Sequence, residues 1–202
     1  MTEFSYLIKI PKERIAVLIG KKGKIKRRIE ETTNTKLDID STEGDVSVSG
    51  KDALTLYATR EIIKAIGRGF NPEIAMLLLK QDYAFEIITI PDHDKKNHLK
   101  RIKGRIIGSN GKTRAIIEEN TECFVSVYGK TISLIGRTDT IHLARKAVEM
   151  IIKGSPHSSV YSWLERMRRQ VIRREHEENF DDYLREPKKE KEEDSLLDEE
   201  EK

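Results

Sequence analysis

The chain has 202 residues, of which 37% are hydrophobic, so it can form two small domains or one of ordinary size but no large core. Its single cysteine excludes an intrachain disulfide and a cysteine cluster for zinc. It has no apolar run long enough to span a membrane and no signal segment, so we expect a cytoplasmic protein. The net charge of +3 is unevenly distributed, because residues 186–202 carry nine acids and four bases, whereas the other 185 residues carry a net charge of +8. A basic body suggests a polyanionic partner. The alternative is that the many charges belong to a heat-adapted surface.

Six elements are predicted in the first 70 residues, in the order strand, helix, helix, strand, strand, helix. Short alternating apolar runs indicate the strands, and apolar residues at three- and four-residue spacing indicate the helices. Pro11 ends the first strand, and Gly20 and Gly23 separate the first two helices. The elements lie at residues 6–10, 12–19, 24–33, 36–40, 45–49 and 52–68.

The same pattern recurs 88 residues later in the chain. The segment Ile-Gly-Lys-Lys-Gly-Lys at residues 19–24 corresponds to Ile-Gly-Ser-Asn-Gly-Lys at residues 107–112, and the likeness continues through the following helix and strand. Because chance rarely produces such a match at a single offset, we infer a duplicated domain. The second set of elements is predicted at residues 85–90, 97–107, 112–120, 124–128, 131–135 and 138–153.

The remaining segments differ in composition from the two repeats. A short apolar helix is expected to start with Asn71 as its cap and Pro72 at its first position, and to pack between the domains. A later helix carries arginines that either contact RNA or form a solvated face, namely Arg166, Arg168, Arg169, Arg173 and Arg174. The predicted division is 1–70 for the first domain, 71–83 for the connecting helix, 84–154 for the second domain, 155–185 for the Arg-rich helical segment and 186–202 for a disordered acidic tail.

A Gly-x-x-Gly loop between two helices suits the phosphate backbone of a nucleic acid. Glycine permits a sharp turn and a close approach, and the free N–H groups at the start of the following helix attract phosphate. Both loops lie in acid-free stretches, with seven cations between residues 14 and 29 and eight between residues 95 and 117. One such loop is also a common turn between helices, but its repetition in the same six-element order predicts binding of single-stranded RNA or DNA.

Other motifs do not support catalysis. Residues 108–113 end like a Walker phosphate-binding loop, but Ile106 stands where that loop needs glycine, and a helix is predicted where it needs a strand. The five histidines have no metal-ligand spacing, and no nucleophile can be placed beside a base. Cys123 is interpreted as a small core residue and Trp163 as a packing residue. We therefore expect no enzyme activity, no catalytic residue, no metal and no cofactor.

These residues resemble the KH domain, whose Gly-x-x-Gly loop clamps about four nucleotides. The family pattern begins at Ile19 in the first repeat and at Ile107 in the second. The helix after each hairpin implies the type I arrangement. The expected fold is α+β, with tandem βααββα domains that each have a three-stranded antiparallel sheet and helices on one face, plus a C-terminal helix. Lys26 and Arg114 depart from the pattern, which has an apolar residue there, whereas Gly104 fits the family's small residue.

The loop chemistry and this resemblance together give a set of expected RNA contacts in the loops, in the helices beside them and on the hairpin strands. The set consists of Gly20, Lys21, Lys22, Gly23, Lys24, Arg27, Ile39, Gly104, Arg105, Ile107, Gly108, Ser109, Asn110, Gly111, Lys112, Arg114, Val125 and Val127.

Over residues 1–185 the chain is similar to a two-KH ribosome-biogenesis family of archaea and eukaryotes, the partner of the Nob endonuclease that trims the 3′ end of small-subunit ribosomal RNA. The tandem spacing, the helix between the repeats, residues 103–114 and the Arg-rich helix carry that likeness. It implies that the RNA is the 3′ end region of small-subunit ribosomal RNA. The implied protein partners are the processing endonuclease and, more remotely, a translation-initiation factor. The alternative is a protein-interaction adaptor that uses one KH surface, with RNA binding incidental.

Overall fold

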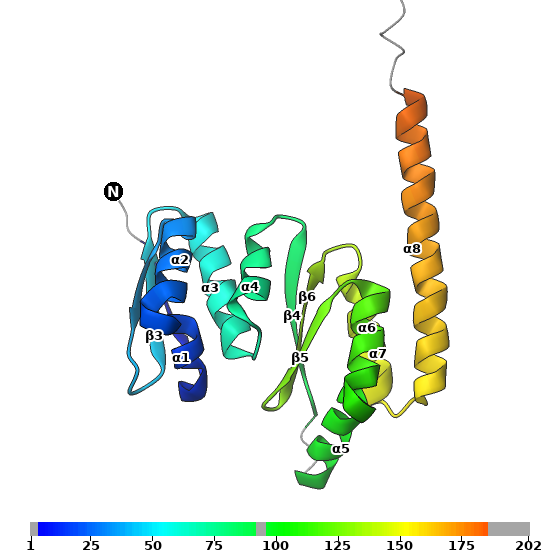
Figure 1. Ribbon diagram of the computed structural model, residues 1–202, viewed down its shortest axis with the longest axis horizontal. Helices are drawn as coiled ribbons and strands as arrows, with labels where there is room; N and C mark the ends of the chain where they lie inside the picture. Colours follow the sequence, from blue (N-terminus) through cyan, green and yellow to red (C-terminus); the bar gives the residue numbers. More distant parts are fainter. Residues whose placement is uncertain (1–3, 92–95, 186–202) are drawn as a thin grey trace, which may run out of the picture. The chain divides into compact units, whose positions relative to one another are not determined.

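The computed structural model describes residues 4–91 and 96–185 of the chain, and Figure 1 shows their helices and strands. Contacts divide the chain into a first unit, residues 1–164, and a second unit, residues 165–202. The predicted α+β fold is confirmed, because the first unit holds two three-stranded antiparallel sheets with helices. The predicted acidic tail at residues 186–202 lies outside the described residues.

The first sheet and its helices follow the predicted order. The strands are arranged β1-β3-β2, with Leu7 opposite Ser47 and Leu37 opposite Val48. Asp52 caps α3, because its carboxylate accepts two backbone N–H hydrogen bonds from the first turn. The elements are β1 (Phe4–Lys9), α1 (Lys12–Ile19), a 3-10 turn (Lys21–Gly23), α2 (Lys24–Thr33), β2 (Lys36–Ile39), β3 (Asp45–Gly50) and α3 (Ala53–Gly67).

One face of this sheet packs on the three helices. Val46 and Val48 of β3 and Leu37 of β2 are buried, whereas the residues between them are more exposed. They form one core with Leu18 of α1 and Ile29 of α2, both fully buried. Each such side chain contributes about 1.5–3 kcal/mol on burial. The core therefore fixes the two helices that flank the first Gly-x-x-Gly loop.

The second sheet repeats this topology in the order β4-β6-β5, but its central strand is buried on both faces. Ile132 and Leu134 of β6 belong to the core beneath the second set of helices, whereas Ile135 belongs to the first core. The back of the second sheet therefore packs on the first repeat. The elements are β4 (Tyr83–Thr89), α5 (Lys96–Ile107), a 3-10 turn (Ser109–Gly111), α6 (Lys112–Thr121), β5 (Phe124–Tyr128), β6 (Thr131–Arg137) and α7 (Ile141–Ile152).

The connecting segment consists of α4 (Pro72–Ala75) and a 3-10 turn (Met76–Leu79). Ile74 and Leu78 are partly buried against the first core, and Phe85 of β4 packs against the same core and meets Phe70 edge-on at 6.3 Å. The prediction that this segment packs between the repeats is confirmed. The predicted helix start is confirmed, with Asn71 at the cap position and Pro72 in the first turn. The carbonyl of Asn71 accepts the N–H of Ala75 at 3.0 Å, although the Asn71 side chain makes no capping hydrogen bond.

Three element boundaries in the second repeat differ from the prediction by two or more residues. β4 begins at Tyr83 and β6 ends at Arg137, two residues beyond the expected ends, because these residues pair directly across the sheet. α7 begins at Ile141 and not at residue 138, because the N–H of Thr138 bonds to the carbonyl of Asp82 at 2.9 Å, outside any helix. Strand pairing partners are not visible in a local sequence pattern.

Helix α8 (His157–Arg185) begins in the first unit. There, Val160 and Leu164 are buried in the second core, and Trp163 is partly buried against it. Lys146 Nζ lies 5.3 Å from the centre of the Trp163 ring. These contacts support the interpretation of Trp163 as a packing residue.

The second unit, taken by itself, is a charged helical segment. Arg169 pairs with Glu165 at 3.9 Å and Arg173 pairs with Glu177 at 2.9 Å, each one helical turn apart. These side chains are mostly exposed, so the pairs contribute little to stability. In the described parts of the chain, no helix combines the length and apolar composition that a membrane span requires.

Candidate nucleic-acid interface

The two Gly-x-x-Gly loops have the same backbone conformation. Gly20 and Gly108 have φ of 71° and 75°, with ψ of 176° in both. In the 3-10 turn that follows, the middle residue is left-handed, with φ of 52° at Lys22 and 51° at Asn110. Asparagine adopts this region more readily than lysine, so the second loop reaches the shared shape at a lower conformational cost.

Gly23 and Gly111 close the loops and stand immediately before the first residues of α2 and α6. Both are left-handed, with φ of 73° and 78°, and a Cβ added to either would meet no described atom within 4 Å. Neither helix start has a side-chain capping hydrogen bond in the described structure. A phosphate can therefore approach the first N–H groups of each helix without obstruction.

Gly20 and Gly108 instead lie against the helix that follows. A Cβ on Gly20 would collide with the side chain of Ile25, and a Cβ on Gly108 would collide with the hydroxyl of Thr113. Thr113 is buried, and its hydroxyl forms a hydrogen bond of 2.8 Å with Tyr161. In both repeats, the residue five places after the first glycine packs directly against that glycine and so fixes the position of the second helix relative to the loop.

Lys26 and Arg114, which stand where the KH pattern has an apolar residue, take part in a polar link to the hairpin. Arg114 Nε lies 3.7 Å from the Glu118 carboxylate, which accepts the backbone N–H of Val125 at 2.8 Å. Because that N–H is occupied, the backbone N–H of Val125 cannot donate to a ligand at the same time. The first repeat has the same arrangement, formed by Lys26, Glu30 and Leu37.

A groove of about 400 Å³ opens beside the second loop. Among the predicted RNA contacts, it brings together Ile107, Arg114, Val125 and Val127. Phe124, with 36% of its surface exposed, also lines it and provides an aromatic side chain on which a base can stack. In the first repeat, Ile39 occupies the position of Val127 and packs, partly buried, against the first core.

The first repeat and the connecting segment contribute part of the wall of this groove, which the sequence did not predict. Arg14 and Phe70 of the first repeat line it, together with Asn71 and Ile74 of the connecting segment. Arg14 is held in place by two backbone carbonyls at the end of α3, because Nε donates to Ile66 at 2.8 Å and Nη2 donates to Phe70 at 2.7 Å. The groove therefore depends on the packing of the two repeats, for which residue spacing carries no signal.

The hairpin of the second repeat rests on the end of α3. Ser126 Oγ donates to the carbonyl of Arg68 at 2.9 Å, and a Cβ on Gly69 would lie only 2.6 Å from that hydroxyl. Desolvation and the neighbouring Glu13 carboxylate raise the pKa of the Tyr128 phenol, another residue that lines the groove.

The other predicted contacts lie around the loops. Lys24 and Lys112 are exposed at the helix starts. Arg27 donates to the carbonyl of Lys22 at 2.8 Å and so braces the first loop. Gly104 is exposed, and a Cβ there would meet no described atom within 4 Å, so its missing side chain does not serve the packing of another helix.

Arg105 has structural partners. Its Nη1 donates to the carbonyl of Ile151 at 2.8 Å, and its Nη2 donates to the carbonyl of Ser155. The carbonyl of Arg105 lies 2.9 Å from Nε2 of His157 at the start of α8. The side chain therefore joins α5 to the segment between α7 and α8.

Replacing Arg105 by Met should lower the free energy of unfolding by about 2 kcal/mol, because two carbonyls would lose a charged donor. Urea unfolding would measure the change, with Lys112→Met, an exposed cation of the second loop, as the control. Equal stability of the two variants would contradict a structural role of Arg105.

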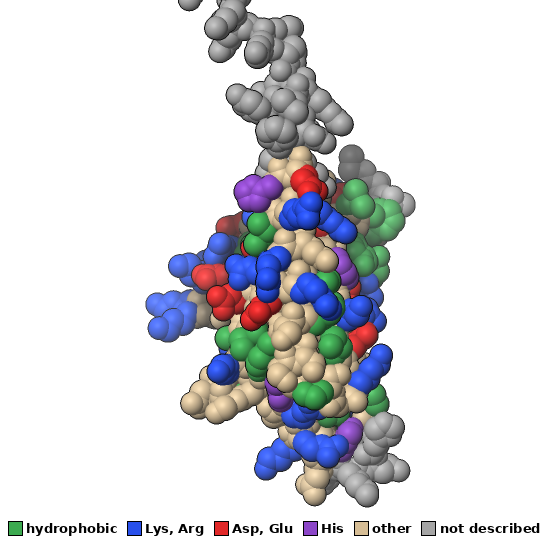
Figure 2. Space-filling model, turned by 90° about the vertical axis from the view of Figure 1, so that its right-hand side faces the viewer, with side chains coloured by type: hydrophobic (Ala, Val, Ile, Leu, Met, Phe, Trp, Pro, Cys, Tyr) green, Lys and Arg blue, Asp and Glu red, His purple; other side chains and the backbone are tan. Residues whose placement is uncertain are grey.

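The remaining chemistry of the described residues gives no sign of catalysis. Cys123 is buried in the second core, which confirms the interpretation as a core residue, and this burial raises the pKa of its thiol. No group of His, Cys, Asp and Glu side chains in the described ranges is placed to hold a metal ion. The segment before Gly108 is helix α5, whereas a Walker loop follows a strand. On the face drawn in Figure 2, Lys and Arg side chains are spread widely and do not gather in one patch.

Family comparisons agree with this arrangement. Residues 5–68 match the KH domain, and residues 84–169 match the second KH domain of PNO1, described as a eukaryotic type, type I KH domain. A KH domain-containing protein of Methanocaldococcus jannaschii is 45% identical over 172 residues, which cover 83% of this chain and 75% of that protein. The RNA-binding protein pno-1 of Caenorhabditis elegans is 32% identical over 124 residues, and the match covers 59% of this chain and 45% of pno-1.

Solved structures show the same similarity. Dim2p from Pyrococcus horikoshii is 48% identical with a TM-score of 0.76, and the match covers 81% of this chain and 99% of that one. A chain in a complex of a/eIF2alpha, Dim2p and rRNA from the same organism is 47% identical, with a TM-score of 0.78 and coverages of 83% and 96%. With two sheets of KH topology, two intact loops and relatives matched over most of its length, this chain belongs to the family of two-KH-domain proteins that includes PNO1 and Dim2p.

Proposed function

We propose that this protein binds single-stranded RNA at the 3′ end region of small-subunit ribosomal RNA and acts as an assembly or processing factor without catalytic activity of its own. The observation that carries the proposal is the pair of Gly-x-x-Gly loops with matching backbones, each opening onto an uncapped helix start. The relatives support the choice of RNA, because their names describe pre-rRNA-processing proteins and one solved complex contains rRNA.

The second repeat is proposed to bind RNA more tightly than the first. The groove of about 400 Å³ adjoins its loop and has walls from both repeats. Its loop also offers Ser109 and Asn110, whose neutral side chains donate directional hydrogen bonds, whereas Lys21 and Lys22 offer charge without fixed geometry. Residues 1–70 and 84–154 would then act as two KH domains of unequal affinity, joined by 71–83 and followed by the Arg-rich segment 155–185.

Protein partners form the second part of the proposal. A translation-initiation factor is supported by the Pyrococcus horikoshii complex, in which a/eIF2alpha accompanies a similar chain. An rRNA-processing endonuclease fits a factor that holds the RNA end to be cut, and a cytoplasmic location fits both partners. The alternative, an adaptor for which RNA is incidental, is favoured only by the surface of the first repeat described below.

Single-stranded RNA should bind at least tenfold more tightly than the same strand in a duplex, because base edges must be free to enter a KH groove. Fluorescence anisotropy with a labelled oligonucleotide from the 3′ end of small-subunit RNA would measure both affinities. Affinity should also fall steeply between about 50 and 200 mM salt, since phosphate contacts release counterions. Equal affinity for the two forms would refute groove binding, and an affinity independent of salt would refute the role of the loops.

A further inference from the structure

Strand β1 has an open edge. It lies at the end of the sheet order β1-β3-β2, with no other described strand beyond it. The N–H of Ile10 donates to the carbonyl of Gly44 on the β3 side at 2.9 Å. Bonded and non-bonded positions alternate in an antiparallel pair, so Ser5, Leu7 and Lys9 point their backbone N–H and C=O groups away from β3. Three consecutive outward positions form the backbone pattern that a further strand would need.

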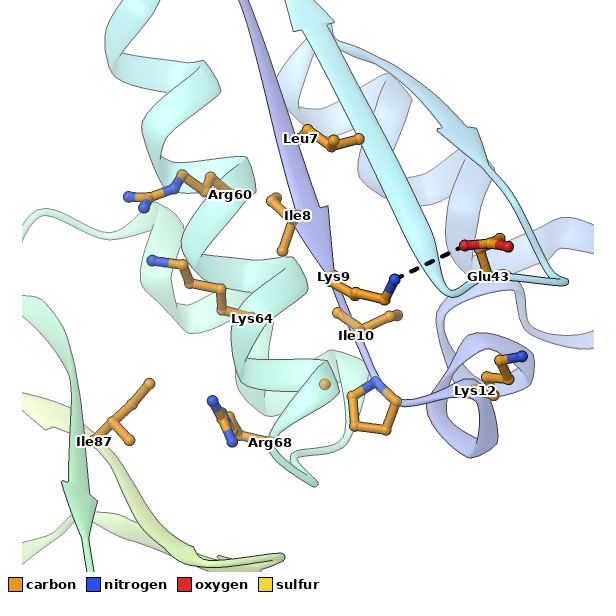
Figure 3. Close-up of a pocket in the computed structure, with 12 residues that line it drawn as sticks. Leu7, Ile8, Lys9, Ile10, Lys12, Glu43, Arg60, Lys64, Arg68 and Ile87 are labelled. Carbon is orange, nitrogen blue, oxygen red and sulfur yellow. Dashed lines mark ion pairs between the residues drawn. The ribbon is translucent and has the colours of Figure 1, made fainter.

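A groove of about 750 Å³ adjoins this edge. Its floor is apolar and includes Leu7, Ile8 and Ile10 of the first repeat and Ile87 of β4. Leu7 has 74% of its surface exposed, and Ile87 has 38%. Figure 3 shows these residues around the end of β1, with Ile8 on the side of the strand that faces α3 and Leu7 on the opposite side. An exposed apolar floor beside an unpaired strand edge is a surface that proteins normally cover.

Basic residues border the groove. Arg60, Lys64 and Arg68 follow one another at four-residue spacing along α3, and Figure 3 shows them on the same side of that helix. Lys9 and Lys12 stand at the other border. The lining of the groove therefore contains five basic residues and one acidic residue, Glu43.

The charge is moderate, because several cations already have partners. Lys9 Nζ lies 4.0 Å from Glu43, and Arg60 and Lys64 share the Glu61 carboxylate at 3.2 and 2.9 Å. A nucleic acid is a poorer match for this groove, because it carries a negative charge on every nucleotide and binds well to the free N–H groups at a helix start, such as those at the loops. At this groove, α3 instead presents its C-terminal end, which carries a partial negative charge. A mixed acidic and apolar peptide matches both the remaining charge and the apolar floor.

We propose that the edge of β1 and the basic side of α3 form a docking site for an extended acidic segment of a partner protein, which adds to the sheet as a fourth strand. Backbone hydrogen bonds to Ser5, Leu7 and Lys9 hold the segment, its acidic side chains face Arg68 and Lys12, and its apolar side chains cover Leu7 and Ile87. The site is separate from both Gly-x-x-Gly loops, so a partner and RNA can be bound at the same time.

The test uses the full chain and a fluorescent decapeptide of alternating Glu and Val with blocked ends. The peptide should bind saturably and slow hydrogen exchange at the amides of Ser5, Leu7 and Lys9. Lys12→Glu with Arg68→Glu should weaken peptide binding at least tenfold, while Lys51→Glu, a matched change at an exposed cation outside the groove, should alter it less than twofold. Leu7→Pro should have an effect as large as the double change, because proline removes an outward N–H from an exposed position.

Three outcomes decide the matter. If the peptide slows hydrogen exchange in the natural protein only at amides of β1, the proposal is supported, even if the Leu7→Pro variant does not fold. Peptide binding that is equally sensitive to Lys51→Glu shows unspecific charge attraction and overturns it. Loss of RNA affinity in the Lys12→Glu, Arg68→Glu variant without peptide binding assigns the groove to RNA and also overturns it. Unchanged RNA affinity leaves the RNA-binding function intact whatever the peptide does.

Discussion

Replacing Gly111 by Asp should weaken binding of single-stranded RNA on the order of 100-fold, because a carboxylate would then stand at the helix start where a phosphate is expected, and charged contacts of this kind contribute about 1.5–3 kcal/mol each. The same change at Gly23 should cost about tenfold or less, since the first loop carries less of the affinity. The two sites are matched: both are left-handed, and a Cβ at either would meet no described atom within 4 Å. Anisotropy at one salt concentration would give both dissociation constants.

The control separates charge from bulk. Gly111→Asn adds a side chain of the same size without charge and also tolerates the left-handed conformation, so it should cost no more than a few-fold in affinity. Urea unfolding of each variant would show that the domain remains folded. If Gly23→Asp costs as much affinity as Gly111→Asp, or more, the proposed inequality of the repeats is wrong.

The two glycines of one motif should respond very differently to alanine. Gly108 has φ of 75° with ψ of 176°, a region that is nearly restricted to glycine, and an added Cβ would collide with the Thr113 hydroxyl and lie 2.7 Å from its backbone nitrogen. Gly108→Ala should therefore destabilise the protein by about 3 kcal/mol or more, by strain and displacement of α6. Gly111→Ala should cost only about 1 kcal/mol, the usual cost of a left-handed alanine. Denaturant unfolding measures both, and equal losses would refute this division of roles.

The order of elements could be predicted because it depends on local patterns. Alternation of Val46 and Val48 marks β3, and the glycines that interrupt a helical pattern mark both loops. The α+β fold with two three-stranded sheets followed from the repeat of these patterns. The helix start at Asn71 and Pro72 was also predicted correctly, but a suitable residue type at a helix start does not determine whether its side chain reaches a backbone N–H, and that of Asn71 does not.

The groove beside the second loop could be predicted only in part. Ile107, Val125 and Val127 belong to the local KH pattern, but Arg14 reaches the groove because the end of α3 supports the hairpin of the other repeat. Arg105 shows the opposite case, in which a cation beside the loop bonds to carbonyls of a distant segment. Long-range packing of this kind leaves no periodic signal in a single sequence.

A crosslinking map of RNA bound to the full chain in its own cells tests the central claim most directly. The map should be made for the natural protein and for the Gly111→Asp variant expressed at the same level. We predict that crosslinks of the natural protein concentrate at the 3′ end of small-subunit ribosomal RNA and are largely lost in the variant. Crosslinks scattered over messenger RNAs, or a 3′-end signal that the variant retains in full, would contradict the account.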